Sequence, residues 1–345
     1  MCALVRCNVG VFGGRPAKLL WHRSVLLPIL SRPSFRGPPQ MKLRMLPAQS
    51  VLLLALAAAS LRAQAPDDGL MMPRKTLNTG VMYMHDSWDE YWEGSLKRSN
   101  GNIGTVTTQS VTLVGHYGVT DRVSFVGELP YVWTHASQGP LHGFSGVQDL
   151  TLALKYRLLT TGFTELGTLS AIVVGAVGVP AGNYSPDFLP LSIGLDSRRA
   201  SARFTLHFDS KADWFIDGSA AHTWRNNVNL DRAAYFTNGQ LYLTNEVEMP
   251  DVFDWKVSTG IRKKRFFIPV SISQQRTQGG GDIRRQDMPF VSNRMNFTKA
   301  DASVMYGLTV PTDLAIQVGA SRILNGRNVG QSTAITAGVF HTFHF

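Results

Sequence analysis

The chain has little cysteine, little charge and no long hydrophobic run. Its 345 residues include only two cysteines, Cys2 and Cys7, and 17% charged residues, whereas soluble domains average about 25%. No stretch reaches the roughly 18 consecutive apolar residues that a membrane-spanning helix needs. These absences exclude a helical membrane protein and disfavour an ordinary charged cytosolic enzyme. The lack of cysteine beyond residue 7 fits an oxidising envelope compartment.

The net charge of +10 suggests a nucleic-acid partner until its distribution is examined. Nine of the 34 basic residues and none of the 24 acidic residues lie in 1–65. Residues 66–345 therefore carry 25 basic and 24 acidic side chains, which is close to neutral. The basic character belongs to the amino-terminal segment, and the sequence predicts no nucleic-acid partner.

Residues 41–65 have the three parts of a secretory signal peptide. A basic start (Met41–Arg44) precedes a short apolar run (Val51–Ala59) and an A-x-A site at Ala63–Ala65. Pro66 disfavours cleavage after Ala65, so cleavage after Ala63 stays open. We interpret residues 1–40 as a mis-assigned upstream extension, with a genuine extension as the alternative. The mature protein is then residues 66–345, or begins one or two residues earlier.

Polar and apolar residues alternate along most of residues 77–345. In 147–158, for example, Leu152, Leu154 and Tyr156 alternate with Ala153 and Lys155. Alternation with a period of two is typical of β-strands with two different faces. No segment shows comparable helical spacing, so the sequence predicts an all-β fold.

The connections between these strands fall into two classes that alternate along the chain. Long polar loops are predicted at 88–104, 134–146, 180–198, 225–250, 277–296 and 324–330, and short turns at 118–121, 160–164, 209–213, 262–264 and 310–313. The alternation holds only if 238–248 belongs to a loop. That assignment leaves about twelve strands and places both termini at the short-turn end.

Long alternating strands with short turns at one end and long loops at the other are typical of a transmembrane β-barrel. The fold class predicted is therefore a transmembrane antiparallel β-barrel of about 12 strands, with short periplasmic turns and long extracellular loops. A soluble β-sandwich or propeller is the alternative. Aromatic residues near the strand ends favour the barrel, because such residues form girdles at membrane interfaces; they are Tyr117, Trp133, Tyr156, Trp214, Trp224 and Trp255.

The chain ends on an alternating strand with Phe343 and Phe345 on one face. A terminal phenylalanine of this kind resembles the assembly signal that outer-membrane proteins present to the barrel-assembly machinery. Phe340 falls on the opposite face, so a bulge or an inward aromatic side chain is expected there.

Two stretches, His116–Val132 and Gly146–Leu159, have a recognisable hairpin pattern, which Tyr306–Thr309 and Thr312–Leu314 repeat in part. They resemble the outer-membrane barrels grouped as the MetA-pathway phenol-degradation family. The resemblance implies transport of small, often aromatic compounds. It supplies no catalytic or ligand residues, and it indicates phenol-like substrates only by association.

The sequence predicts no catalytic, cofactor or metal site. Gly143–Gly146 is one residue short of a nucleophile elbow, and the histidines lack metal-ligand spacing. His207 and Ser219 could be neighbours across the 209–213 turn, which leaves a lipid-modifying enzyme as an alternative. Gly279–Gly281 with Arg284 and Arg285 indicates an external loop suited to anionic lipopolysaccharide.

If the apolar side chains face lipid, the opposite faces of the strands supply the lumen. The residues predicted to face the lumen are Arg122, Glu128, Asp149, Lys155, Arg157, Arg203, His207, Asp217, Asp254, Lys256 and Asp301. Charges of both signs can pair across neighbouring strands, because unpaired burial is unfavourable. These charges either brace a filled barrel or form a constriction that selects solutes; Met305 and Val126 add apolar lining.

The sequence therefore predicts an outer-membrane channel for passive uptake of small solutes, phenol-like compounds among them, in the bacterial outer membrane. It predicts no cofactor. The expected partners are outer-membrane lipids and lipopolysaccharide, the barrel-assembly machinery and a small-molecule solute. A lipid-modifying enzyme and a structural or adhesive barrel with a plugged lumen are the alternatives.

Overall fold

The computed structural model describes residues 65–345 apart from 164, 285–287 and 309–312, all within one compact unit that spans 52–345. The upstream extension predicted at 1–40 lies outside the described residues, as does all of the predicted signal peptide except Ala65. No helix of the described residues is long and apolar enough to cross a membrane.

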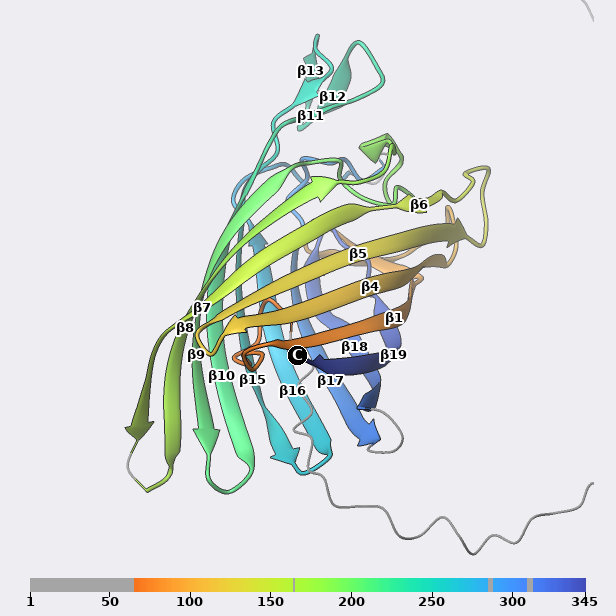
Figure 1. Cartoon of the computed structure of the whole chain (residues 1–345). Helices are drawn as coiled ribbons and strands as arrows, with labels where there is room; N and C mark the ends of the chain where they lie inside the picture. Colours follow the sequence, from red (N-terminus) through yellow and green to blue (C-terminus); the bar gives the residue numbers. More distant parts are fainter. Residues whose placement is uncertain (1–64, 164, 285–287, 309–312) are drawn as a thin grey trace, which may run out of the picture. The chain divides into compact units, whose positions relative to one another are not determined.

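Twelve long antiparallel strands form a closed barrel (Figure 1). They are β1 (Thr76–Trp88), β4 (Val106–Thr120), β5 (Val123–Ala136), β7 (Asp149–Phe163), β8 (Gly167–Pro180), β9 (Arg199–Ser210), β10 (Trp214–Arg225), β15 (Val252–Lys263), β16 (Phe266–Thr277), β17 (Asn296–Leu308), β18 (Leu314–Arg327) and β19 (Thr333–His344). Each pairs with its neighbours in chain order, and β1 closes the barrel by pairing with both β4 and β19. The predicted strand number and fold class are confirmed.

The remaining elements are short and lie in the connections at the long-loop end. They are β2 (Glu90–Glu93), β3 (Leu96–Ser99), β6 (Ser145–Val147), the 3₁₀ turn η1 (Pro186–Phe188), β11 (Val228–Asn229), β12 (Tyr235–Thr237), β13 (Gln240–Tyr242) and β14 (Glu246–Val247). Residues 238–248 thus belong to a loop that folds on itself, as the alternation of turns and loops predicts. The turn expected at 160–164 comes slightly later, because β7 continues to Phe163 and β8 begins at Gly167.

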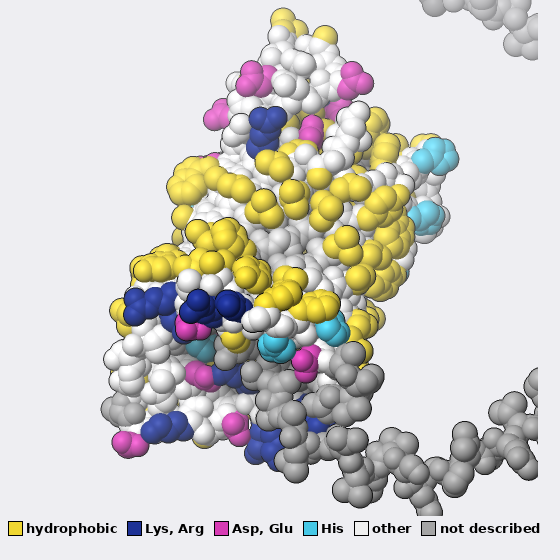
Figure 2. Space-filling view, viewed as in Figure 1, with side chains coloured by type: hydrophobic (Ala, Val, Ile, Leu, Met, Phe, Trp, Pro, Cys, Tyr) yellow, Lys and Arg dark blue, Asp and Glu magenta, His cyan; other side chains and the backbone are white. Residues whose placement is uncertain are grey.

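The two faces of the strands differ in the way that the alternation predicts. On β7, Leu152, Leu154 and Tyr156 are exposed on the outside, whereas Ala153 and Lys155 are buried inside. Figure 2 shows hydrophobic side chains gathered in a belt over the strands, with charged side chains concentrated beyond it. Water does not favour so much exposed apolar surface, but a hydrocarbon layer does. Closure also leaves no unpaired strand edge, which a hydrocarbon layer requires.

The long-loop end is covered by loops that have their own small core. Six buried residues form it: Val228, Leu230, Tyr235, Val247, Met249 and Val291. Tyr235 stacks on Tyr242 and on Phe290, with ring centroids 5.1 and 5.2 Å apart. Exposed ion pairs also link the loops, among them Arg232 with Asp187 and Arg327 with Asp282. The loops therefore form a folded cover.

Candidate functional site

The chain that precedes β1 lies inside the barrel. We call residues 65–75 the lumenal segment; its path is the orange loop near the short-turn end in Figure 1. Lys75 donates its backbone N–H to the Gly118 carbonyl at the short-turn rim. From there the segment runs into the lumen as far as Ala65. Gly118 makes the entry possible, because a Cβ at that position would lie 1.9 Å from the Pro73 carbonyl oxygen.

One buried ammonium group holds the inner end of this segment. The Lys155 side chain is fully buried, and its Nζ donates to Asp68 Oδ1 at 2.7 Å, to the Ala65 carbonyl at 2.9 Å and to the Asp68 carbonyl at 3.0 Å. An ammonium has three donors, so these three acceptors satisfy it completely. Removing one partner of a buried pair leaves an uncompensated charge, which makes Lys155 the main electrostatic anchor of the segment.

A second set of polar contacts surrounds the next residues. Lys256 Nζ donates to Asp67 Oδ2 at 2.9 Å. Gly69 lies directly against the hydrogen-bonded side chains of His207 and Asp217. A Cβ on Gly69 would lie 2.4 Å from Asp217 Oδ1 and 2.5 Å from His207 Cβ. Only glycine fits at this point of contact.

Two apolar side chains complete the attachment of the lumenal segment. Leu70 packs in one cluster of buried residues with Phe215, Phe267, Met305, Ala315 and Phe340. Met71 packs in another with Val126, Ala153, Ile172 and Val174. Phe340 is therefore the inward aromatic expected at the end of the chain, and its ring covers Gly80. The segment fills the short-turn half of the lumen with apolar contacts as well as charges.

Polar side chains form a row across the lumenal face of the sheet. The register aligns hydroxyl, carboxylate and imidazole groups on successive strands, interrupted only at Ala334. In order from β7 to β5, this polar row consists of Thr160, Ser170, His207, Asp217, Ser258, Ser271, Asp301, Ser321, Asp86, Thr108 and Thr134. Neighbouring members are hydrogen-bonded at several steps, such as Ser258 to Asp217 at 3.3 Å.

The polar row climbs along the barrel because the strands tilt. Thr160 lies near the β7–β8 turn, at the short-turn end, whereas Thr134 lies two residues before the end of β5, at the long-loop end. Strand tilt and register stagger are geometrically linked in any barrel. A row of neighbours across the sheet therefore passes from one end of the lumen to the other. Residues 67–72 cover its lower part near His207 and Asp217.

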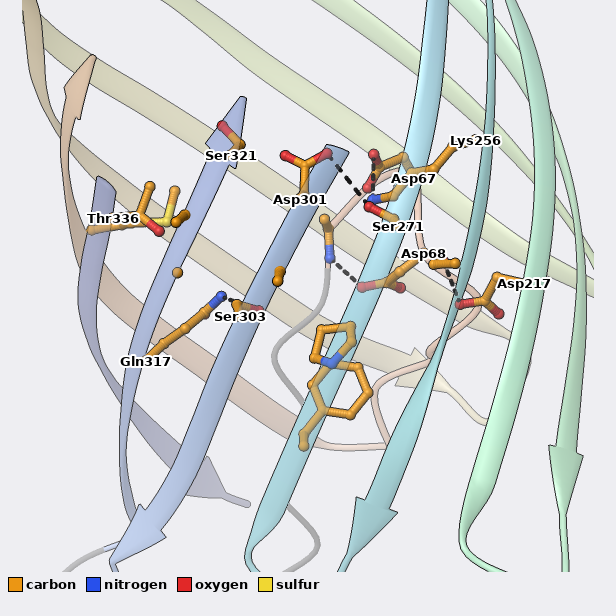
Figure 3. A pocket seen from close by; sticks show the side chains of 18 of the residues that line it. Asp67, Asp68, Asp217, Lys256, Ser271, Asp301, Ser303, Gln317, Ser321 and Thr336 are labelled. Atoms are coloured by element: carbon orange, nitrogen blue, oxygen red, sulfur yellow. Dashed lines mark hydrogen bonds and ion pairs between the residues drawn. The ribbon is translucent and has the colours of Figure 1, made fainter. Parts of the chain in front are cut away.

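Above the lumenal segment is a cavity of about 330 Å³. Its wall includes the inner end of the segment, with Asp67 and Asp68, and polar-row residues from β15 to β18. Figure 3 shows Asp67 close to Lys256, with Ser271 and Asp301 beside them. Apolar residues of β1, β4, β16 and β19 complete the wall. Solutes of one-ring size fit such a space.

The structure places most of the residues predicted to face the lumen inside the barrel. Lys155, Lys256, Asp217, Asp301 and Glu128 surround the lumenal segment or the cavity. The others form cross-strand pairs or lie near the short-turn end: Arg203 with Asp254 at 2.6 Å, His207 with Asp217, Asp149 with Arg199 at 2.5 Å, and Arg157 beneath them.

Arg122 is the exception. It occupies the turn between β4 and β5 and is exposed, so its predicted lumenal position is wrong. β5 begins at Val123, so the strand alternation does not extend to Arg122, although Ser124 and Glu128 keep their predicted inward face. Arg122 is thus a rim residue of the short-turn end.

The terminal phenylalanines lie on the outer face. Phe343 and Phe345 are 43% and 73% exposed, in contrast to the buried Phe340. Their exposure leaves both rings free for contact with lipid or with another protein; the assembly signal itself stays a prediction.

The described residues contain no group of three His, Cys, Asp or Glu side chains that could hold a metal ion. His207 does not face Ser219. Its neighbour on β10 is Asp217, while Ser219 lies opposite Thr205 and accepts a hydrogen bond from Arg203 at 3.0 Å. The serine–histidine pairing considered from the sequence is therefore not formed.

Neither the lumenal segment nor the role of His116 in the lumen is predicted from the sequence. Both ring nitrogens of His116 are buried without a hydrogen-bond partner among the described residues. The only sequence signal for the segment is its position: two acidic residues, a glycine and three large apolar residues (Asp67–Met72) follow shortly after the predicted cleavage site.

Family models and curated proteins give no match to this chain. Among solved structures, it is similar to the COG4313 outer membrane channel from Pseudomonas putida F1, with 17% sequence identity and a TM-score of 0.62. That similarity covers 82% of this chain and 100% of the other.

Two further structures are less similar. The NanC porin has 8% identity and a TM-score of 0.40 over 75% of this chain and 98% of that one. The Pseudomonas putida toluene transporter TodX has 12% identity and a TM-score of 0.36 over 79% and 90%. Both similarities are too low to carry an argument. The first establishes for this chain the barrel fold of an outer-membrane channel, the fold that its sequence predicts.

Proposed function

We propose that this protein is a channel of the bacterial outer membrane for the passive uptake of small solutes, one-ring aromatic compounds among them. The observation that carries the proposal is a closed barrel with an apolar outer belt and a polar, partly open lumen. The similarity to the outer membrane channel of Pseudomonas putida and the resemblance to the phenol-degradation family support it. A passive path of this kind needs no cofactor.

The filling of the lumen indicates a narrow path. Barrels of about eight strands are filled by side chains, whereas those of 16–18 strands enclose a wide aqueous channel. A twelve-stranded barrel falls between, and here the lumenal segment narrows its short-turn half. Charges of both signs line what remains, so the size and charge pattern of a solute decide its passage.

The proposal includes the partners expected of such a channel. The outer belt contacts lipid, and the exposed Arg284 in the loop between β16 and β17 contacts anionic lipopolysaccharide. Phe343 and Phe345 serve as the signal for the barrel-assembly machinery, after export directed by the predicted signal peptide. Loss of membrane insertion on truncation of these two residues would support this role.

Conductance in planar bilayers tests the channel proposal. We expect stable single-channel steps from the protein purified from outer membranes, and a dose-dependent decrease of the current on addition of phenol. A barrel that is folded, as shown by heat-dependent migration in gels, but silent in both conductance and liposome-swelling assays would contradict it.

The alternatives receive less support from the structure. A lipid-modifying enzyme needs a nucleophile beside a base, and Ser219 is held by Arg203 instead of His207. A purely structural or adhesive barrel does not require an internal cavity. Acyl-chain hydrolysis that is abolished by a single serine substitution would favour the enzyme.

A further inference from the structure

The cavity above the lumenal segment has two chemically different walls. Its apolar wall comes from β1, β4, β16 and β19, with Met82, Met84, Val114, Phe267 and Phe340. Phe267 and Phe340 are 8% and 5% exposed, so their rings are fixed by packing. Aromatic rings and thioethers favour contact with a flat aromatic solute.

A second part of the wall is rich in hydrogen-bond acceptors, and β16 contributes to both parts. The middle of the polar row supplies Ser258, Ser271, Asp301 and Ser321, on four successive strands. Adjacent strands lie about 4.8 Å apart. Each of these four strands therefore offers a hydrogen-bond acceptor to a donor group on a solute.

The cavity has more negative than positive groups. Five carboxylates line it (Asp67, Asp68, Glu128, Asp217 and Asp301), but only two ammonium groups, Lys256 and Lys299. Four of these carboxylates have partners: Asp67 pairs with Lys256, Asp68 with Lys155 behind the wall, Asp301 with Lys299 at 3.0 Å, and Asp217 hydrogen-bonds His207.

Glu128 is the carboxylate that lacks a partner. No hydrogen bond or ion pair joins it to another of the described residues, and it lies within electrostatic range of both Asp67 and Arg199. On the neighbouring strand its register partner is Val114, a residue of the apolar wall. A negative group thus stands at the edge of the apolar wall, where it disfavours an anionic solute.

His116 on β4 is an independent sign of a ligand. It forms part of the cavity wall and is only 2% exposed, yet neither ring nitrogen has a partner among the described residues. Buried polar groups are nearly always hydrogen-bonded in proteins. A solute hydroxyl in the cavity would satisfy one of these nitrogens.

We propose that this cavity is a binding site for one-ring aromatic solutes that carry a hydroxyl or ammonium group and no carboxylate. The ring packs on Phe267, Phe340 and the two methionines. The donor group bonds to the polar row or to His116. The proposal rests on the proposed channel function, and it narrows the solutes of that channel by charge and by hydrogen-bonding capacity.

Ligand-observed NMR titration of the full barrel in detergent tests the proposal with four probes. Phenol and anisole differ in the donor group, and benzylammonium and benzoate differ in charge. We expect saturable binding of phenol and benzylammonium. Anisole should bind more weakly than phenol, and benzoate should bind at least about tenfold more weakly than benzylammonium, because like charges repel at short range.

Two single substitutions locate the site. Asp301→Asn should weaken benzylammonium binding about fivefold, as expected for the loss of one nearby opposite charge, and weaken phenol binding less. His116→Ala should weaken phenol binding more than benzylammonium binding. Asp231→Asn is the matched control, since it removes the same charge from an exposed external loop.

Heat-dependent migration in gels shows whether each variant folds. If Asp301→Asn does not fold, the double variant Ser271→Ala with Ser321→Ala tests the same wall through the loss of donor discrimination. Equal binding of benzoate and benzylammonium by the wild type would overturn the proposal. An effect of Asp231→Asn as large as that of Asp301→Asn would do so as well.

Liposome flux separates this proposal from the channel function. Selective binding without flux would keep the site and reject the channel. Flux of all four probes without selective binding would keep the channel and reject the site.

Discussion

The two ends of the barrel are closed in physically different ways. At the short-turn half, a single chain segment fills the lumen and is held by fully buried charge at Lys155. At the long-loop end, several loops share a small apolar core, and exposed ion pairs such as Arg327–Asp282 join them. The filling of the short-turn half depends on a few buried contacts, whose charges water cannot reach if a partner is lost. The cover at the long-loop end depends on many contacts of modest strength.

This difference indicates where a single substitution should change stability and conductance most. A buried ion pair that loses one partner costs about 3–5 kcal/mol, whereas an exposed pair contributes about 0–1 kcal/mol. We therefore expect the lumenal segment to respond sharply to single changes. The loop cover should respond gradually.

Removal of the lumenal segment should have the largest effect. Deletion of residues 66–71 removes Asp67 and Asp68, which pair with Lys256 and Lys155. It also removes the apolar contacts of the segment and leaves the pairing of β1 with its neighbours intact. We expect single-channel conductance to rise at least about threefold, because the lumen of a twelve-stranded barrel is then open along its length. An unchanged conductance would show that the narrowest point lies in the loops.

Gly69→Leu should displace the segment without removing it. The side chain has no room beside His207 and Asp217. We therefore expect a noisier current, with frequent openings that reach the single-channel conductance of the variant that lacks residues 66–71. Gly218→Leu is the control, because its Cβ would meet nothing within 4 Å. Equal behaviour of the two variants would contradict the tight contact at Gly69.

Tyr235→Ala should weaken the loop cover. Its ring is buried in the loop core and stacks on two others, and loss of a buried aromatic side chain costs about 3 kcal/mol. We expect faster trypsin cleavage at Arg232 and only a small change in conductance. Tyr242→Ala, which removes a more exposed ring, should accelerate cleavage less.

The smallest effect is expected from acidification of the loops. The hydrogen bond from Arg327 holds the pKa of Asp282 below its ordinary value of 3.8. A lowered pKa in the folded state stabilises the loop at pH values above 3.8, and this contribution is lost as the pH falls through the lowered value.

Because the pair is exposed, the loss should stay below about 1 kcal/mol. Relative to its cleavage of an unstructured reference peptide at the same pH, pepsin should therefore cleave the loop between β16 and β17 somewhat faster at pH 2 than at pH 4. Asp282→Asn should remove this difference in the relative rate. A persistent pH dependence in that variant would assign it to another group.

The barrel could be predicted from the sequence because its determinants are local and repeated. Alternation sets the two faces of each strand, and the order of turns and loops fixes the strand number, even around 238–248. Arg122 was misplaced because β5 begins one residue later, so that Arg122 lies in a turn where the strand alternation no longer sets the direction of a side chain. Such boundaries depend on turn geometry, which composition does not determine.

The filling of the lumen could not be predicted in the same way. Residues 65–75 have no period, and their contacts reach Lys155, Lys256 and Asp217, which are distant in sequence. The signal-peptide pattern predicts a leader at 41–65 but indicates nothing about the residues that follow it. The polar row likewise becomes visible only when the register joins residues of eleven strands.

The inward position of Ala65 also has a consequence for biogenesis. The segment comes before β1 in the chain, enters the cylinder at the short-turn rim and reaches Lys155 inside it. Any peptide still attached ahead of Ala65 would have to share the interior or be threaded out of it. Leader removal is thus expected to help the segment reach its place, and cleavage after Ala63 keeps the Ala65 carbonyl that Lys155 binds. A bulky fusion at the amino end should stall maturation, whereas the same fusion in the exposed 238–248 loop should be displayed on the finished protein.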